Sequence, residues 1–319
     1  MKKLLLIDVD CGTDDAAAIM MALASPSAEV LGITCCYGNS LLENTCKNVL
    51  RVLYVCNKLE IPVYPGVALP MIGGPPVLEF YYGKDGLGDV PDPSAPGLDL
   101  LQKEHAVHAI IRIVNEHPGQ VSLIATGPLT NLALAVKMDP TFPEKLKNVI
   151  IMGGNMEGRG NVTVCGEFNF ATDPEAANIV LNEYTCPTYI ATWEFVLSNQ
   201  LSWEFCQGWI NQNTKKAKFM KKIYSYTLEQ IKLSQKKSGK KEDEFGFVSC
   251  DSYAVAAAID EKFITEVIEI GVTVELSGSL TKGMMVLDWE DKLKKKNKAF
   301  VLKKCDLGKL QALMMAALL

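Results

Sequence analysis

Short runs of apolar residues alternate along the chain with longer stretches in which apolar residues recur every three or four positions. Five of the short runs are typical of buried strands: LLLIDVD, VLGITCC, VSLIATG, NVIIMGG and TYIATW. Helical spacing is found in DDAAAIMMALAS, LLENTCKNVLRVLYVCN, AVHAIIRIVNEH, PLTNLALAVKM and DPEAANIVLNE. Strands that alternate with helices in this way predict an α/β fold with a mostly parallel central sheet flanked by helices.

Prolines and glycines mark the connections between these elements. Pro128 and Pro174 are expected in the first turns of helices, where a missing N–H costs nothing, with Asp173 as the cap of the second helix. Residues 66–99 are rich in Gly, Pro and Asp and are too long for an ordinary connection, so they predict a loop with a binding role.

Composition narrows the class of protein. The chain has 319 residues, of which 48% are hydrophobic and 22% charged, and this balance excludes disorder. No apolar run approaches the roughly 20 residues that cross a bilayer. The apolar start LLLI ends at Asp8 and Asp10, unlike a secretory signal. We therefore expect a soluble, cytoplasmic protein without membrane partners.

Charge and cysteine content exclude further classes. The net charge is −5, and the Lys-rich segments at 214–241 and 292–304 predict solvated surfaces rather than a nucleic-acid site. Ten cysteines without regular CxxC pairs are expected to be reduced and mostly buried. The three histidines, His105, His108 and His117, share one helix-like segment, so we expect no catalytic histidine.

Carboxylates are concentrated where the first predicted strand ends and the first helix begins, at Asp8, Asp10, Asp14 and Asp15. In open α/β sheets, ligands bind at the carboxyl ends of strands. Burying several unpaired carboxylates together would cost several kcal/mol, so a cation is expected to neutralise them. Ligation by oxygen atoms alone favours Ca²⁺ or Mg²⁺ over Zn²⁺. The alternative is that Asp14 and Asp15 only interact with the helix dipole.

A second polar concentration is the segment GEFNFATDPEA, which contains Glu167, Phe168, Asn169 and Phe170. An extended backbone would put its two polar side chains on one face and both rings on the other. A carboxylate and an amide can together satisfy sugar hydroxyls, which both donate and accept hydrogen bonds. The alternative is a capped loop that leads into the helix after Asp173.

Asp251 is a third candidate, at the start of the apolar helix that contains AVAAAID. An Asp at this position is commonly a helix cap. It becomes a candidate metal ligand because Ca²⁺ requires more oxygens than two aspartates provide.

In this order and spacing, the segments DVDCGTDDAAAI, GITCCYGN, ATGPLTNLA, MGGN and GEFNFATDPEAA, with the Asp251 helix, closely resemble the nucleoside hydrolase family, the inosine-uridine-type N-ribohydrolases. The resemblance spans most of the chain and implies one domain over residues 1–319 with a Rossmann-like core. It also implies Ca²⁺-dependent hydrolysis of ribonucleosides to free base and ribose. We further expect a homodimer or homotetramer.

The resemblance implies a role for each matching residue. The Ca²⁺ ligands would be Asp10, Asp15, Asp251 and the backbone carbonyl of Thr126, and Asp10 would also be the base. The ribose 2′ and 3′ hydroxyls would be held by Asp14, Asn39 and Asn169, the 5′ hydroxyl by Asn161 and Glu167, and Met152 would line the ribose floor. Met152 could instead be a core residue, and Asn39 a turn residue.

The chain departs from the family where the base leaves. Many members have His-Asp-Pro where this chain has Cys250-Asp251-Ser252, and His-Gly where it has Tyr82-Gly83. Cys250 and Tyr82 are therefore the candidate proton donors to the leaving base. Because a purine is protonated at N7 more readily than a uracil is, we expect inosine or guanosine to be hydrolysed faster than uridine.

Other readings stay open. A silent ribose-binding protein would keep the sugar contacts without catalysis, but Asp10 is present. A haloacid dehalogenase-like phosphatase also begins with D-x-D, but the residues after Asp10 do not fit that family.

The Lys-rich helix that contains Tyr224, Tyr226 and Glu229 is expected to close over the nucleoside, with Tyr226 in contact. The polar segment KKSGKKEDEFG follows it. The alternative is an inert surface helix.

Overall fold

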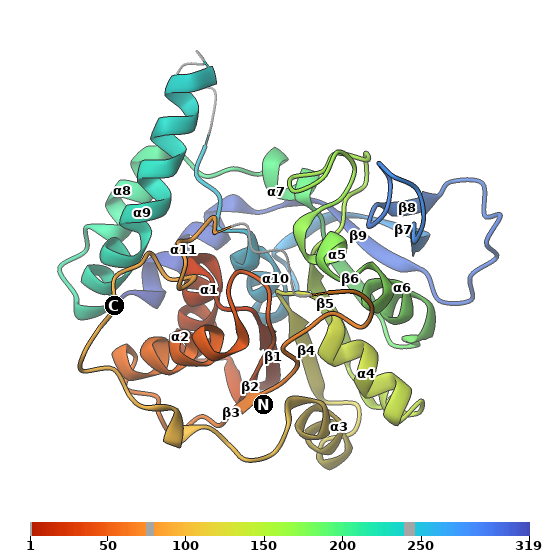
Figure 1. Ribbon diagram of the computed structural model, residues 1–319, viewed down its shortest axis with the longest axis horizontal. Coiled ribbons are helices and arrows are strands. Elements are labelled where there is room, and N and C mark those ends of the chain that lie inside the picture. The colour runs from red at the N-terminus through yellow and green to blue at the C-terminus, as the bar shows by residue number, and fades with distance from the viewer. Residues whose placement is uncertain (1, 75–79, 239–245) are drawn as a thin grey trace.

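The central sheet has nine strands in the order β3-β2-β1-β4-β5-β6-β9-β7-β8 within the residues that the computed structural model describes, which are 2–74, 80–238 and 246–319 (Figure 1). The strands are β1 (Lys3–Val9), β2 (Ala28–Cys35), β3 (Val63–Pro65), β4 (Val121–Ala125), β5 (Asn148–Met152), β6 (Thr188–Ala191), β7 (Ile264–Val274), β8 (Met285–Asp288) and β9 (Ala299–Cys305). β1 to β6 and β9 pair in parallel, and β7 runs antiparallel to both β8 and β9. The predicted α/β fold with a mostly parallel sheet is confirmed.

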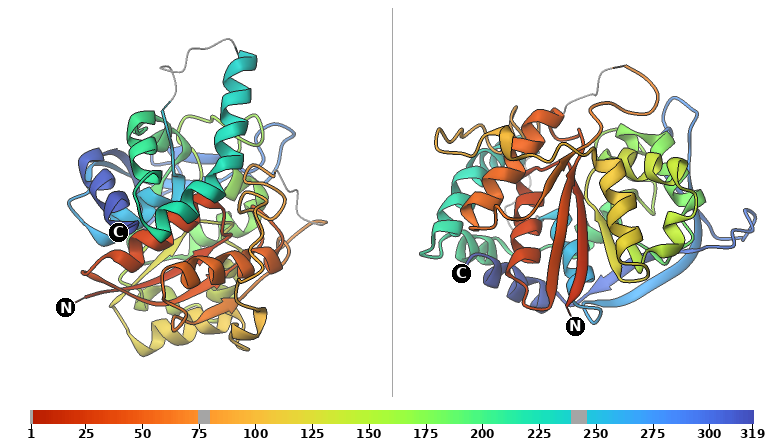
Figure 2. Two further views of the ribbon diagram at one scale, coloured as in Figure 1. Left: turned by 90° about the vertical axis from the view of Figure 1, so that its left-hand side faces the viewer. Right: turned by 90° about the horizontal axis from the view of Figure 1, so that it is seen from below.

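Helices cover both faces of this sheet (Figures 1 and 2). They are α1 (Thr13–Ala24), α2 (Leu42–Val55), α3 (Ala106–Glu116), α4 (Thr130–Met138), α5 (Phe168–Thr172), α6 (Pro174–Glu183), α7 (Trp193–Ser198), α8 (Trp203–Ile210), α9 (Lys215–Ser238), α10 (Cys250–Ile259) and α11 (Leu307–Ala317). None of the helices in the described part of the chain is long and apolar enough to cross a membrane.

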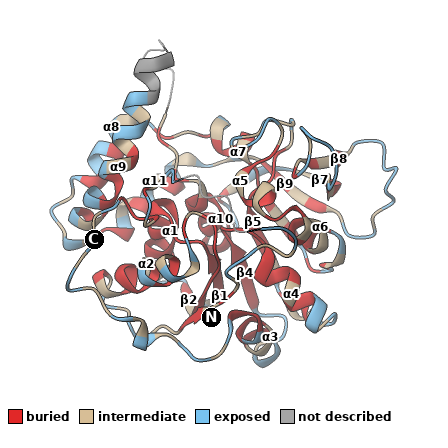
Figure 3. Cartoon of the chain, in the orientation of Figure 1, coloured by how far each residue is buried: buried red, intermediate tan, exposed pale blue. Residues whose placement is uncertain are grey.

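Strand β1 shows how the apolar pattern builds the two layers. Leu5, Ile7 and Val9 pack with α1, α2, α10 and α11 on one face of the sheet. Leu6, which points the other way, packs with α3, α4 and α6. Because successive side chains of a strand point to opposite faces, a continuous apolar run is what a strand covered on both sides requires. Figure 3 shows the result, with buried residues filling the strands and the inner faces of the helices.

The structure corrects two predictions about local structure. Helix α4 begins at Thr130 with Leu129 as its N-cap, so Pro128 precedes the helix instead of lying in its first turn. Residues 168–172 form the short helix α5, so the expected extended backbone at this segment is wrong. Pro174 does begin a helix, and Asp173 caps it by accepting from the N–H of Ala176.

The Lys-rich stretch forms helix α9, as predicted, and its C-terminal part projects from the body of the molecule (Figure 1). Most of the polar segment after it, residues 239–245, lies outside the described residues, as do residues 75–79 of the long loop. The rest of that loop carries short turns, including the 3₁₀ turn Leu98–Leu100, and contributes Tyr81 and Tyr82 to the site described next.

Candidate active site

The carboxyl ends of the parallel strands open into a cavity of about 680 Å³. Strands β1 to β6 have the order 3-2-1-4-5-6 of doubly wound folds, in which ligands bind where the order reverses. That point lies between β1 and β4, whose ends are followed by Asp10 and Thr126. Ten of the predicted site residues line the cavity: Asp14, Asn39, Tyr82, Thr126, Met152, Asn161, Glu167, Asn169, Cys250 and Asp251.

Asp10 is fully buried beside this cavity, and the backbone around it leaves little room for other groups. Its Oδ2 accepts a hydrogen bond of 2.8 Å from the N–H of Asn39. A Cβ atom added to Gly38 would be 2.0 Å from Oδ2 of Asp10, and one added to Gly127 would be 2.9 Å from its Cβ. Two glycines from different strand ends are therefore needed to accommodate this carboxylate.

Three carboxylates of the acidic segments converge. Oxygens of Asp14, Asp15 and Asp251 lie within 4.8 Å of one another, and all three residues are buried. Asp15 is held in place, because its Oδ2 accepts from the N–H of Gly12 at 2.8 Å and its Oδ1 accepts from the hydroxyl of Thr126 at 2.7 Å. This group contains Asp14, whereas the family resemblance implies Asp10 as the third acidic ligand.

The chemistry of this cluster fits a hard divalent cation. Burial is the largest cause that raises the pKa of Asp10, Asp15 and Asp251, and neighbouring carboxylates raise the three pKa values further. The pKa of Asp15 rises to about 7. Oδ1 of Asp10 is buried and has no hydrogen-bond partner among the described residues. Oxygen ligands held together at such an electrostatic cost are suited to Ca²⁺ or Mg²⁺.

Asp8, the first acidic residue of the motif, does not belong to the cluster of Asp14, Asp15 and Asp251. Its side chain accepts hydrogen bonds from Thr34 and from the amide of Asn131, at 2.8 Å for the latter. Burial raises its pKa to about 7. Asn131 also donates to the carbonyl of Cys35, so Asp8 helps to fix the ends of β1 and β2 below the cavity.

The ribose-binding candidates are fixed by backbone contacts. Glu167 caps α5 by accepting from the N–H groups of Asn169 and Phe170, and its Oε2 also accepts from the N–H of Gly154 at 2.7 Å. The amide of Asn169 donates to the carbonyls of Thr126 and Met152, at 2.9 and 3.0 Å. These contacts place one carboxylate and one amide at the wall of the cavity.

The short helix α5 changes which side chains face the cavity. Glu167, Phe168 and Asn169 all line it, whereas Phe170 is fully buried in the core. The two rings therefore do not share a packing face, contrary to the alternating pattern. Asn161 also lines the cavity, and its Oδ1 accepts from the N–H of Phe168 at 2.8 Å.

Glu194 holds the loop that carries Asn161. Its buried carboxylate accepts from the N–H groups of Met156, Glu157 and Arg159, at 2.8, 2.9 and 3.3 Å. These hydrogen bonds tie the loop to the first turn of α7, which follows β6.

Tyr82 and Cys250, the candidate proton donors, both line the cavity. Burial raises the pKa of the Asp14 carboxyl, and the neighbouring side chain of Tyr82 opposes this effect in part. Burial and nearby acidic groups raise the pKa of Cys250 and of Tyr82, which favours the protonated thiol and phenol.

Sequence reasoning identified one part of the lining and missed another. Tyr224, which belongs to the stretch expected to close over the nucleoside, faces the cavity from α9, and so does Thr227 one helical turn later, whereas Tyr226 does not line it. Trp193 and Gln200 contribute from α7 and the residues after it. The spacing of Tyr224 and Thr227 was a usable signal, but Trp193 and Gln200 belong to no recognisable motif.

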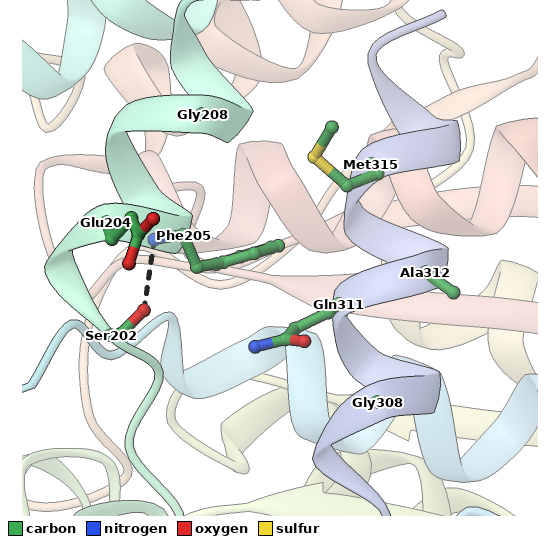
Figure 4. A pocket seen from close by; sticks show the side chains of 8 residues that line it. All are labelled: Ser202, Glu204, Phe205, Gly208, Gly308, Gln311, Ala312 and Met315. Carbon is green, nitrogen blue, oxygen red and sulfur yellow. Dashed lines mark hydrogen bonds between the residues drawn. The ribbon is translucent and has the colours of Figure 1, made fainter.

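A second hollow lies between α8 and α11 (Figure 4). It is lined by Ser202, Glu204, Phe205, Gly208, Gly308, Gln311, Ala312 and Met315. None of the predicted site residues contributes to it, and Glu204 is the one carboxylate in its lining. The acidic cavity is therefore the candidate active site.

Comparisons with known proteins agree with this geometry. A sequence model of the family described as inosine-uridine preferring nucleoside hydrolase matches residues 5–312. The chain belongs to the nucleoside hydrolase family, whose members are metal-dependent hydrolases. This membership supports hydrolysis of the N-glycosidic bond of ribonucleosides and agrees with the family resemblance of the sequence motifs.

Individual relatives differ in the bases they are named for. The chain is 34% identical over 322 residues to the inosine-uridine preferring nucleoside hydrolase of Leishmania major, covering 100% of this chain and 98% of that protein. It is 41% identical over 179 residues to probable uridine nucleosidase 1 of Oryza sativa, where the match covers 55% of this chain and about half, 54%, of the relative. A solved inosine-guanosine nucleoside hydrolase superposes with a TM-score of 0.89 at 30% identity, covering 100% and 99% of the two chains.

Proposed function

We propose that this protein is a Ca²⁺-dependent ribonucleoside hydrolase that releases free base and ribose, with a preference for purine nucleosides. The observation that carries the proposal is the convergence of the Asp14, Asp15 and Asp251 carboxylates at the switch point of the sheet, beside a cavity lined by sugar-binding side chains. We also propose that residues 1–319 act as one domain, because one sheet joins strands from both ends of the chain.

The ion would be held by Asp10, Asp15, Asp251 and the carbonyl of Thr126. When bound, it would supply the positive charge that offsets these carboxylates, orients ribose hydroxyls and makes a nearby water easier to deprotonate. Asp14 contacts Tyr82 and lies at the cavity wall, which suits it to accept a hydrogen bond from a ribose hydroxyl.

Different side chains would act on the attacking water and on the ribose hydroxyls. Oδ1 of Asp10 would take the proton from the attacking water, while Asn39 keeps the carboxylate oriented through Oδ2. Asn39 and Asn169 would hold the 2′ and 3′ hydroxyls together with Asp14. Asn161 and Glu167 would hold the 5′ hydroxyl, and Met152 would form the floor. Fixed contacts at every ribose hydroxyl favour the flattened ring of an oxocarbenium-like transition state.

The base would occupy the other end of the cavity, near Cys250 and the aromatic side chains of Tyr82, Trp193 and Tyr224. Aromatic faces favour the larger purine ring system, and Cys250 and Tyr82 would donate hydrogen bonds to the departing base. The relatives are named for both purine and pyrimidine nucleosides, so purine preference is a proposal about this chain.

A panel of ribonucleosides with measurement of released ribose tests the function. We expect release from inosine and guanosine, a lower rate for uridine, and loss of activity when Ca²⁺ is chelated. Binding of nucleosides without release of base would favour a silent ribose-binding protein. We also propose a cytoplasmic homodimer or homotetramer, which fractionation and light scattering would check.

A further inference from the structure

We propose that Arg51 is a positioning residue for the reaction: it anchors the loop of residues 82–90 to α2 and thereby keeps Tyr82 over the acidic cluster. The inference rests on the proposed function, in which Asp14 binds the ribose. Arg51 belongs to none of the motifs that the family resemblance uses, and it does not line the cavity.

Tyr82 touches the acidic segment at two points. A Cβ atom added to Gly12 would be 2.6 Å from Cδ2 of Tyr82, so the ring lies directly against the backbone between Asp10 and Asp14. The Tyr82 side chain also lies beside the Asp14 carboxylate, with which it lines the cavity. A shift of this ring would change the orientation of Asp14, and with it the contact to the sugar.

The loop that carries Tyr82 is tied to itself by short hydrogen bonds. The carbonyl of Tyr82 accepts from the N–H of Gly88 at 2.7 Å. Oδ1 of Asp85 accepts from the N–H groups of Leu87 and Asp89, at 2.7 and 3.0 Å. Leu87 is fully buried. The loop is therefore a compact unit, and whatever holds one part of it holds Tyr82.

Two side chains of α2 hold this unit to the body of the protein. Nη2 of Arg51 donates to the carbonyl of Val90 at 2.6 Å, and its Nη1 lies 3.7 Å from Oδ2 of Asp85. Asn48, one helical turn earlier, donates to the carbonyl of Asp85 at 2.8 Å and to that of Cys11 at 3.1 Å. These contacts connect the loop to the strand end that carries the proposed base.

Arg51 faces α9 from α2, and its surroundings indicate that it positions the loop more than it stabilises the fold. The residue is 7% exposed, and its Nε has no hydrogen-bond partner in the described ranges. Its guanidinium lies 5.9 Å from the ring centre of Phe219 on α9. A charge that is buried with incomplete pairing contributes little to stability compared with an apolar side chain of similar size. Its polar contacts are directed instead at the loop.

The first test is a double-mutant cycle on inosine hydrolysis. Arg51→Met keeps the packing volume and removes the charge. Asp85→Asn weakens the same contact from the loop side, and it serves as the second variant if Arg51→Met folds poorly. We expect each to lower kcat/KM by roughly tenfold to hundredfold, as misplacement of a binding group does. In the Tyr82→Phe background, which lacks the hydroxyl beside Asp14, the same changes should cost less than about threefold.

Additive losses in the Tyr82→Phe background would overturn the proposal, as would Arg51→Met and Asp85→Asn variants with wild-type kcat/KM. Arg112→Met is the matched control, because Arg112 lies on α3, pairs with Glu104 and Glu116, and does not line the cavity. It should leave kcat/KM unchanged.

Hydrogen exchange gives a second result that does not depend on turnover. We expect Arg51→Met to speed exchange of the amides in residues 82–90 at least tenfold, while the amides of α3 stay as in the wild type. Unchanged exchange in 82–90 would show that Arg51 does not hold the loop. Failure of the wild-type protein to release ribose would instead contradict the proposed function, so the two failures are distinguishable.

Discussion

The backbone N–H of Asn39 binds one oxygen of Asp10 at 2.8 Å, while the other oxygen, Oδ1, has no partner among the described residues. The two residues come from the ends of neighbouring strands, β1 and β2, so the sheet itself sets the orientation of the carboxylate. One oxygen is used for positioning, and the second can accept a proton. This division is what a general base beside a water molecule requires.

Asp10→Asn is therefore expected to lower kcat for inosine by on the order of 10²–10⁴-fold, because an amide cannot accept the proton. Ribose release measures the effect. Asp291→Asn, an exposed change in the loop after β8, is the control and should leave kcat unchanged. Near-normal turnover by Asp10→Asn would show that another group is the base.

Ca²⁺ should stabilise the protein against heat through the acidic cluster. At about 100 times its Kd, a ligand that binds only the folded state contributes about 2.7 kcal/mol, and we expect a rise in Tm of several degrees after chelated protein is supplied with Ca²⁺. Asp15→Asn and Asp251→Asn should lose most of this rise, and Asp291→Asn should keep it. An equal rise in all variants would place the ion elsewhere. A larger rise with Mg²⁺ would contradict the choice of ion.

Glu167 should make stability depend on pH. Burial raises its pKa from the ordinary 4.5 to about 7. Between these two pH values, the folded protein therefore holds a proton that the unfolded chain has already lost. The resulting stability is present in full below pH 4.5 and is lost as the pH rises through about 7. Glu167→Gln removes this group.

The free energy of unfolding of the wild type minus that of Glu167→Gln should therefore fall by about 3 kcal/mol over that pH range. Urea denaturation of both proteins in chelator measures the difference. A difference that is constant with pH would mean that the three N–H donors to this carboxylate balance the effect of its burial, so that its pKa is equal in the folded and unfolded protein.

Base preference should follow the polar groups near the leaving base. We expect a higher kcat/KM for inosine than for uridine, and we expect Cys250→Ser and Tyr82→Phe to change at least one of these values severalfold. Parallel assays on both nucleosides measure this. A preference for uridine would contradict the purine proposal, and two variants identical to the wild type on both substrates would remove these residues as donors to the base.

Helix α9 should become more protected when the cavity is filled, because Tyr224 and Thr227 face the ligand from this helix. Hydrogen exchange at residues 222–238, with and without a ribosyl transition-state analogue, measures the effect, and α3 serves as an internal reference. Equal exchange in the two states would indicate that α9 is a static wall.

The parallel part of the sheet and much of the site were predictable from sequence because several motif residues directly follow a buried apolar strand. Asp10 follows β1 and Thr126 follows β4, whereas Asp251 lies in the first turn of the apolar helix α10. Such residues must meet at one edge of a parallel sheet, whatever the length of chain between them.

The rest of the fold and site lacked a local signal. Strand β7 is exposed over much of its first half, so its apolar content does not mark it as a strand of the core. Helix α5 was not predicted because five residues are too few to show a helical pattern of apolar positions. Its N-cap is Glu167, whose side chain accepts hydrogen bonds from two backbone N–H groups. Trp193 stands at the end of the predicted strand TYIATW but belongs to no motif, and Gln200 reaches the cavity only through the packing of the residues after α7.

Strand β9 comes last in the chain, yet it lies between β6 and β7. During synthesis on the ribosome, the sheet therefore cannot close until residues 299–305 have emerged, long after the acidic residues of β1 and the α10 helix are available. Until then, β6 is an open edge and β7 has no parallel sheet to join, and such edges invite pairing with other chains. The synthesis of β9 thus governs when the nascent chain can cover the edges of β6 and β7.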